Sequence, residues 1–220
     1  MSVGSQLKRL IIVGAGGFGR EVATWAAAVP ASDRDWETGA FLDANRDALA
    51  TYTFPWPVIG DPASYVPEPR DRFVCAIGDP TTKLAICQQL LDRGAVFTTL
   101  RHPTVLVGGN TRIGVGAIMC PYAIITDSVT IGDFVTINVH TTIGHDVTIG
   151  RGSTLSSHCD VTGFARLGEG AFLGSSAVIL PKVQVEDFAR VGAGSVVLRN
   201  VRAGSTVFGV PAVEMPAVRR

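Results

Sequence analysis

The sequence predicts two units, an α/β Rossmann-like domain over residues 1–100 and a parallel β-helix built from hexapeptide repeats over residues 101–220. Three observations support this division. An apolar run, a glycine-rich turn and an alanine-rich segment follow one another near the start. An aliphatic residue recurs at every sixth position of the second half. No flexible-linker composition separates the halves, so we expect them to pack rigidly on each other.

The first unit begins with "KRLIIVGAGGFGREVATWAAAV", which reads as strand, turn and helix, and Gly14, Gly16 and Gly19 form a GxGxxG pattern. We expect strands near 8–13, 38–43, 73–77 and 95–99, and helices near 18–29 and 81–93. These elements make up about one mononucleotide-binding half, whereas a dinucleotide site needs two. The glycines are therefore expected to bind a nucleotide diphosphate at the helix N-terminus. The alternative is that they only shape a turn.

In the second unit, sixteen consecutive positions spaced by six, from Val107 to Val197, are aliphatic. A small or β-branched residue follows four positions later, and glycine often follows directly, where we expect it to supply a corner conformation that other residues resist. A helix cannot have this period. Three hexapeptides make one triangular coil, so residues 107–202 predict about five coils with the aliphatic side chains inside.

Three of the four histidines lie within "INVHTTIGHDVTIGRGSTLSSHCDV", residues 137–161. Counting each hexapeptide from its aliphatic residue, His145 is at position three, and His140 and His158 are at position four. All three positions point outward, whereas Cys159 is at an inward small position. His140 and His145 have the spacing of two zinc ligands in the β-helical γ-class carbonic anhydrases. The residues two coils earlier supply no third imidazole, so we expect no metal site.

The phrase "TTIGHDVTIG" is similar to a segment of hexapeptide-repeat sugar acetyltransferases, the family of sialic-acid O-acetyltransferases and UDP-4-amino-sugar N-acetyltransferases. The resemblance covers the C-terminal half and implies a left-handed parallel β-helix. It also implies that His145 is the general base and that Asp146 increases its basicity. Imidazole titrates near neutral pH, which suits the removal of a proton from an attacking amine or hydroxyl.

The same resemblance implies contacts to both co-substrates. Acetyl-CoA is expected near Thr154, Gly163, Ser175 and Ala193. Charge alone, rather than the resemblance, suggests that its 3′-phosphate lies near Lys182, Arg199, Arg219 or Arg220. Thr154 stands where the family has a second histidine. The nucleotide of the sugar is expected at Gly16, Gly17, Phe18, Asp43, Ala44 and Gly78, although Phe18 replaces a family histidine and Ala44 an acidic residue. The closing segment "FGVPAVEMP" (208–216) is expected to cap the β-helix beside the cofactor.

These expectations amount to an acetyl-CoA-dependent N-acetyltransferase acting on a nucleotide-linked amino sugar in bacterial glycan or surface-polysaccharide synthesis. A homotrimer with active sites at its subunit interfaces is expected. One alternative is O-acetylation of sialic acid or a related sugar, and another is a nucleotide-binding scaffold without catalysis.

Composition narrows the possible partners and setting. The 19 basic and 19 acidic residues balance, and no basic run appears, so nucleic acid is not an expected partner. The apolar run "LIIV" at 10–13 is too short for a membrane span or a signal peptide. The four cysteines show no CxxC pairing, which fits a reducing, cytoplasmic setting.

Overall fold

The computed structural model describes residues 8–216. Its first part is a parallel four-stranded sheet of order β3-β2-β1-β4. The elements are β1 Lys8–Val13, α1 Gly17–Ala28, the 3₁₀ turn η1 Ala31–Asp33, β2 Trp36–Leu42, β3 Val58–Gly60, β4 Asp71–Cys75 and α2 Pro80–Asp92. This strand order is that of a mononucleotide-binding half, as the sequence predicts.

Two predictions for this domain need correction. Strand β3 is absent from the sequence prediction, because its three residues lie among prolines and turns that hide any alternation. The strand predicted near 95–99 is reduced to one bridge, between Phe73 and Phe97. After Phe97 the chain turns away from the edge of the sheet formed by β4 and enters the β-helix at β5 (Leu100–Arg101). A longer fifth strand therefore cannot form.

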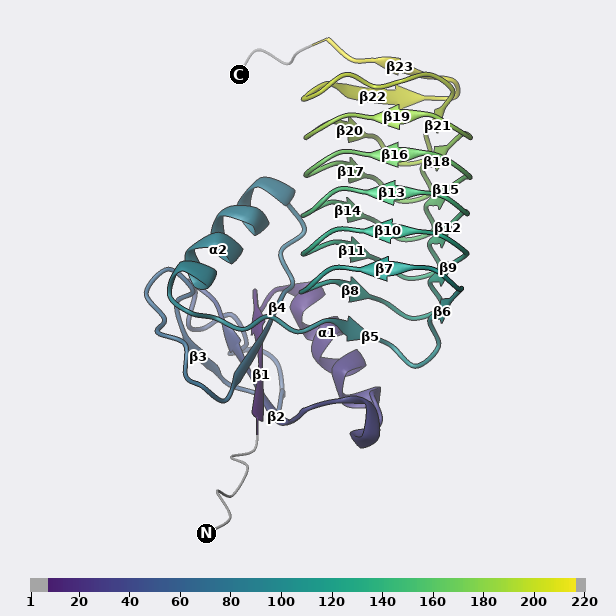
Figure 1. The fold of residues 1–220 in the computed structure, drawn as a ribbon. Coiled ribbons are helices and arrows are strands. Elements are labelled where there is room, and N and C mark those ends of the chain that lie inside the picture. Colours follow the sequence, from purple (N-terminus) through teal and green to yellow (C-terminus); the bar gives the residue numbers. More distant parts are fainter. Residues whose placement is uncertain (1–7, 217–220) are drawn as a thin grey trace.

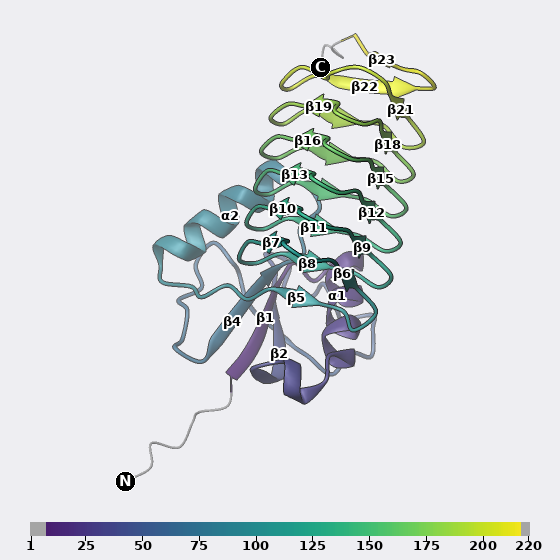
Figure 2. The same ribbon diagram turned by 45° about the vertical axis from the view of Figure 1, so that its right-hand side comes forward.

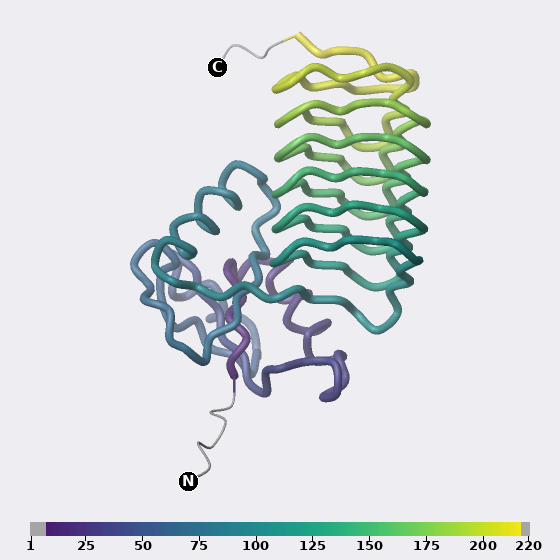
Figure 3. The backbone as a smooth tube through the Cα atoms, viewed as in Figure 1, coloured from purple at the N-terminus to yellow at the C-terminus, as the bar shows by residue number. Residues whose placement is uncertain are grey.

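The second part is a three-faced β-helix whose coils stack along one axis (Figures 1 and 3). The first face contains β5, β8 (Ile118–Met119), β11 (Thr136–Ile137), β14 (Thr154–Leu155), β17 (Phe172–Leu173), β20 (Arg190–Val191), β22 (Thr206–Gly209) and β23 (Ala212–Glu214). The second contains β6 (Leu106–Val107), β9 (Ile124–Ile125), β12 (Thr142–Ile143), β15 (Asp160–Val161), β18 (Val178–Ile179) and β21 (Val196–Val197). The third contains β7 (Arg112–Ile113), β10 (Thr130–Ile131), β13 (Thr148–Ile149), β16 (Arg166–Leu167) and β19 (Gln184–Val185).

The predicted register is confirmed. From β5 to β18, each strand pairs in parallel with the strand eighteen residues later, as Thr136 does with Thr154, and β20 pairs with β22 sixteen residues later. The aliphatic series is buried from Met119 to Val197, and the small residues four positions later are buried as well. Cys159 is among them, as expected. The five strands of the third face agree with about five coils, and β22 and β23 close the last coil as an antiparallel hairpin.

The expected role of glycine was wrong in one respect. The backbone takes positive φ at position four of every hexapeptide from Asn110 to Gly194, and most of these residues are not glycine. The glycines directly after the aliphatic residue serve close packing between coils instead. A Cβ atom on Gly132 would lie 2.7 Å from the backbone nitrogen of Arg151 in the next coil.

The two domains share a continuous interface on the first face of the β-helix, which Figure 2 shows from the side. Ile118 and Cys120 belong to the same apolar cluster as Leu10 and Val22 of the N-terminal domain. Near α2, Phe97 and Phe134 pack edge to face, with ring centroids 4.9 Å apart. The predicted rigid packing of the two halves is thus built from buried apolar contacts.

Lys83 of α2 crosses this interface and is fully buried. Its Nζ atom donates to the carbonyl oxygens of Phe134 and Ser153, at 3.2 and 3.3 Å, and to the hydroxyls of Thr136 and Thr154, at 3.0 and 2.8 Å. Burial lowers the pKa of Lys83 to about 8, against smaller opposing effects of Cys75, Cys87 and Asp79. The amine therefore ties α2 to two successive strands of the β-helix.

Candidate functional site

His145 projects from the edge between the second and third faces, directly after β12, and this edge is called the His145 edge below. Its Nδ1 atom lies 2.8 Å from Oδ2 of Asp146, and the two side chains are 59% and 45% exposed. Nδ1 bound to a carboxylate carries the proton of the neutral ring, which leaves Nε2 as the basic atom. The arrangement can therefore remove a proton from a group that approaches Nε2.

Neighbouring coils hold the ring in place. Phe164, one coil later, packs edge to face against His145 with ring centroids 5.0 Å apart. Gly163 lies beneath the ring, because a Cβ atom there would come within 2.8 Å of both Cε1 and Nε2 of His145. Asp146 has φ +58°, a conformation that aspartate tolerates better than most residues. The predicted pair and Gly163 thus form one cluster.

The other predicted cofactor residues are divided between two edges. Ser175 and Ala193 are exposed on the edge between the first and second faces, which also holds His140 and is called the His140 edge. Lys182 and Arg199 are exposed on the His145 edge, above Gly163. Arg219 and Arg220 lie outside the described residues.

Thr154 lies in the interface between the two domains. Only 5% of its surface is exposed, and its hydroxyl accepts the hydrogen bond from Lys83. The sequence could not reveal this, because the partner is 71 residues away. The cofactor contact expected at Thr154 stays a prediction.

The glycine turn before α1 has the form that a phosphate site requires. Gly14 has φ +98°, and Gly19 packs directly against the Gly14 carbonyl. A Cβ atom on Gly16 would meet no atom within 4 Å, and Gly17 is equally exposed. The first-turn amides of α1 have no side-chain cap, and the first turn itself holds no acidic residue, so these amides are open to an anion.

The remaining predicted nucleotide residues surround this turn. Asp43 accepts a hydrogen bond from the Ala15 amide at 2.8 Å and another from the Asn45 amide at 2.9 Å, so its carboxylate also orders the turn. Ala44 is exposed beside it, and Phe18, in the first turn of α1, is partly buried against the apolar cluster of the N-terminal domain. Gly78, after β4, has open space around it.

Asp79 and Arg190 form a link that the sequence analysis missed. Asp79 caps α2 by accepting from the Thr82 amide at 2.9 Å, and Arg190 of β20 donates to it at 2.6 Å. The Thr82 amide and then Arg190 hold the pKa of Asp79 below its ordinary value. The "DPTT" sequence signals the cap, but nothing in the sequence signals the arginine. The pair joins the Gly78 loop to the β-helix.

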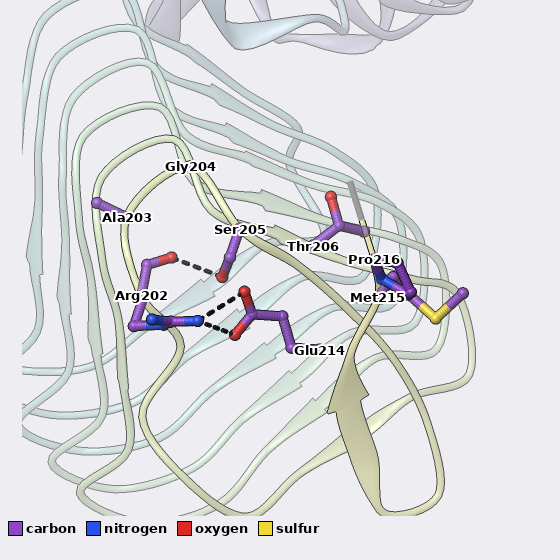
Figure 4. Close-up of a pocket in the computed structure, with 8 residues that line it drawn as sticks. All are labelled: Arg202, Ala203, Gly204, Ser205, Thr206, Glu214, Met215 and Pro216. Atoms are coloured by element: carbon purple, nitrogen blue, oxygen red, sulfur yellow. Dashed lines mark hydrogen bonds and ion pairs between the residues drawn. The ribbon is translucent and has the colours of Figure 1, made fainter. Parts of the chain in front are cut away.

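A surface cavity of about 690 Å³ lies at the C-terminal end of the β-helix rather than beside His145. Figure 4 shows its lining, in which Arg202 pairs with Glu214 at 2.7 Å and Ser205 donates to the Arg202 carbonyl. Elsewhere in residues 8–216, no group of three or more histidine, cysteine or acidic side chains is arranged to hold a metal ion. No helix in that range combines the length and apolar character that crossing a bilayer demands.

Each of the two domains contains a segment that matches a known protein family. Residues 9–90 match the PglD N-terminal domain, and residues 165–199 match the hexapeptide repeat of succinyl-transferase. The chain is 32% identical over 76 residues to GDP-perosamine N-acetyltransferase of Escherichia coli O157:H7. This sequence match spans 34% of either protein.

Two solved structures share the fold over nearly the whole chain. The acetyltransferase domain of PglB from Neisseria gonorrhoeae FA1090, in complex with acetyl coenzyme A, is 25% identical with a TM-score of 0.86 and covers 96% of this chain and 100% of its own. PerB from Caulobacter crescentus, in complex with CoA and GDP-perosamine, is 27% identical with a TM-score of 0.85 and covers 96% and 99%. The chain thus joins a PglD N-terminal domain to hexapeptide repeats, and its fold is that of the PglB and PerB acetyltransferases, which confirms the resemblance to hexapeptide-repeat sugar acetyltransferases.

Proposed function

We propose that the protein transfers an acetyl group from acetyl-CoA to the amino group of a nucleotide-linked amino sugar, with His145 as the general base. The observation that carries the proposal is the exposed His145–Asp146 pair, in which a carboxylate holds Nδ1 and Nε2 lies over Gly163 without a hydrogen-bond partner among the described residues. The likeness to PglB and PerB, solved with acetyl coenzyme A and with CoA plus GDP-perosamine, supports the choice of co-substrates.

The reaction follows from this geometry. The sugar amine attacks the thioester carbonyl, and its nitrogen loses a proton to His145 Nε2 as the C–N bond forms. Asp146 stabilises the resulting imidazolium through Nδ1. The C–S bond then breaks, and the proton returns from His145 to the departing sulfur. The products are the acetamido sugar and CoA, and no covalent acyl-enzyme is needed.

The site is proposed to be completed by a second copy of the chain, in a homotrimer. His145 lies on one edge of the prism, whereas the N-terminal domain packs near the opposite edge of the second face, through Cys120 and Val139. The predicted cofactor positions are divided in the same way, since Gly163 is on the His145 edge and Ser175 is on the His140 edge. Packing the His145 edge of one subunit against the His140 edge of the next would bring base, cofactor and nucleotide together.

Replacement of His145 by asparagine tests the base. We expect kcat to fall by roughly 10²- to 10⁴-fold, with little change in the binding of either co-substrate, because the lost proton transfer belongs to the transition state. His102→Asn is the matched control, since His102 lies at the domain junction and bonds to Thr104. A His145→Asn enzyme with nearly wild-type kcat would refute the assignment.

Mixing two inactive chains tests the shared site. His145→Asn removes the base, and Gly16→Trp fills the open space at the nucleotide turn. If each site combines two subunits, co-refolding equal amounts should restore about a quarter of the wild-type rate, because random assembly pairs two intact halves in that share of sites. No recovery in a mixture that light scattering shows to be a trimer would place both groups in one subunit.

A further inference from the structure

Three exposed aromatic side chains form a stack along the His140 edge. The rings of Tyr122 and His140 are 5.0 Å apart with an interplanar angle of 13°, and those of His140 and His158 are 5.0 Å apart at 7°. They occupy position four of the same edge in three successive coils, with φ between +56° and +62°. Position four takes positive φ in every hexapeptide from Asn110 to Gly194, so the backbone aligns the three positions but does not require aromatic side chains there.

The two imidazoles have unused hydrogen-bonding groups. Between residues 8 and 216, neither the His140 nor the His158 ring forms a hydrogen bond, whereas His102 and His145 each bind a neighbour through Nδ1. Because the rings stack face to face, their nitrogen-bearing edges point away from the stack axis. Two imidazoles this close repel each other when both are protonated, and an anion beside them relieves that repulsion.

The stack and the glycine turn adjoin the same apolar cluster. Val139, next to His140 in the chain, packs against this cluster, and so does Phe18 in the first turn of α1. Cys120, two residues before Tyr122, is buried in the same cluster. The uncapped N-terminal end of α1, with Gly16 and Gly17 open to solvent, therefore adjoins the same apolar cluster as the chain segment that carries His140.

We infer that His140 and His158 bind the diphosphate of a nucleoside diphosphate-linked sugar, across from the amides of the Gly16–Gly17 turn. This inference rests on the proposed function and adds two substrate-binding residues to it. Tyr122 holds the lower face of the stack. A diphosphate presents oxygens on both of its phosphorus atoms, so each imidazole can donate to one phosphate in a charge-assisted hydrogen bond.

The test is the affinity of the full-length protein for UDP and GDP, measured by calorimetry, with CoA measured in parallel. The double variant His140→Asn/His158→Asn keeps residues that accept positive φ but removes the imidazoles. We expect at least a tenfold weaker nucleotide affinity and unchanged CoA affinity. Phe188→Asn, at position four of the third edge, is the matched control and should leave both affinities unchanged.

A second variant separates hydrogen bonding from stacking. His140→Phe/His158→Phe retains three stacked rings without nitrogen donors, and it should bind nucleotide as weakly as the asparagine variant. Wild-type nucleotide affinity in either double variant would overturn the inference, as would a loss confined to CoA. If the wild-type protein itself bound neither UDP nor GDP and transferred no acetyl group, the proposed function would fail and this inference with it.

Discussion

Replacement of Lys83 by methionine perturbs the one fully buried lysine of residues 8–216, at the seam between α2 and the β-helix. Methionine keeps the length of the side chain but removes the amine that donates to Thr136 and Thr154. It also removes the titration of this amine. The informative quantity is therefore the pH dependence of the difference in unfolding free energy between wild type and variant.

The magnitude follows from the pKa. Burial lowers the pKa of Lys83 from 10.5 to about 8. Below pH 8 both the folded and the unfolded protein hold the proton, so the difference is constant. Between pH 8 and 10.5 the unfolded chain binds a proton that the folded protein does not, so wild-type stability rises with pH. The full shift corresponds to about 3 kcal/mol.

Urea denaturation at fixed protein concentration, at pH 7 and pH 10, measures this difference. We expect the free energy of unfolding of Lys83→Met relative to wild type to fall by about 2–3 kcal/mol between the two pH values. Lys182→Met, at an exposed lysine, should show no such change. A relative stability that stays constant, or rises, would show that Lys83 is not held in a desolvated site.

Three further predictions follow from the geometry. Gly163→Ala should lower kcat by about tenfold at nearly unchanged thermal stability, because the added Cβ atom would displace the His145 ring. Steady-state kinetics and calorimetry measure the two quantities, and an unchanged kcat would contradict the prediction. Gly132→Ala should destabilise the protein by about 2 kcal/mol in urea denaturation, because the new methyl group meets the backbone of the next coil. A free energy of unfolding equal to that of the wild type would show that the coils can separate freely. Asp79→Asn should reduce stability at pH 6 but much less at pH 3. The lowered pKa of Asp79 contributes its full stabilisation above the ordinary pKa of 3.8, and this contribution is lost as pH falls through the pKa of the folded state. An equal loss of stability at both pH values would exclude the charge of the Arg190 pair as the cause.

The hexapeptide register is readable from the sequence because it is a strictly local rule. Each coil repeats the same inward aliphatic and small residues, so the spacing alone places His145 on an outward position. The strand, glycine turn and helix of the first domain are predictable for the same reason. The fifth strand near 95–99 is not, because its length depends on where the chain must leave the sheet to enter the β-helix.

What the sequence determined by itself is the repeat, the two-domain order and the identity of His145 and Asp146 as neighbours on one edge. Only the tertiary structure decided that Thr154 belongs to the domain interface, that Lys83 is its partner, and that the rings of His140 and His158 stack. The physical reason is distance along the chain. Spacing reports which way a side chain points within its own coil, but burial, desolvation and stacking depend on surfaces contributed by residues that are remote in sequence.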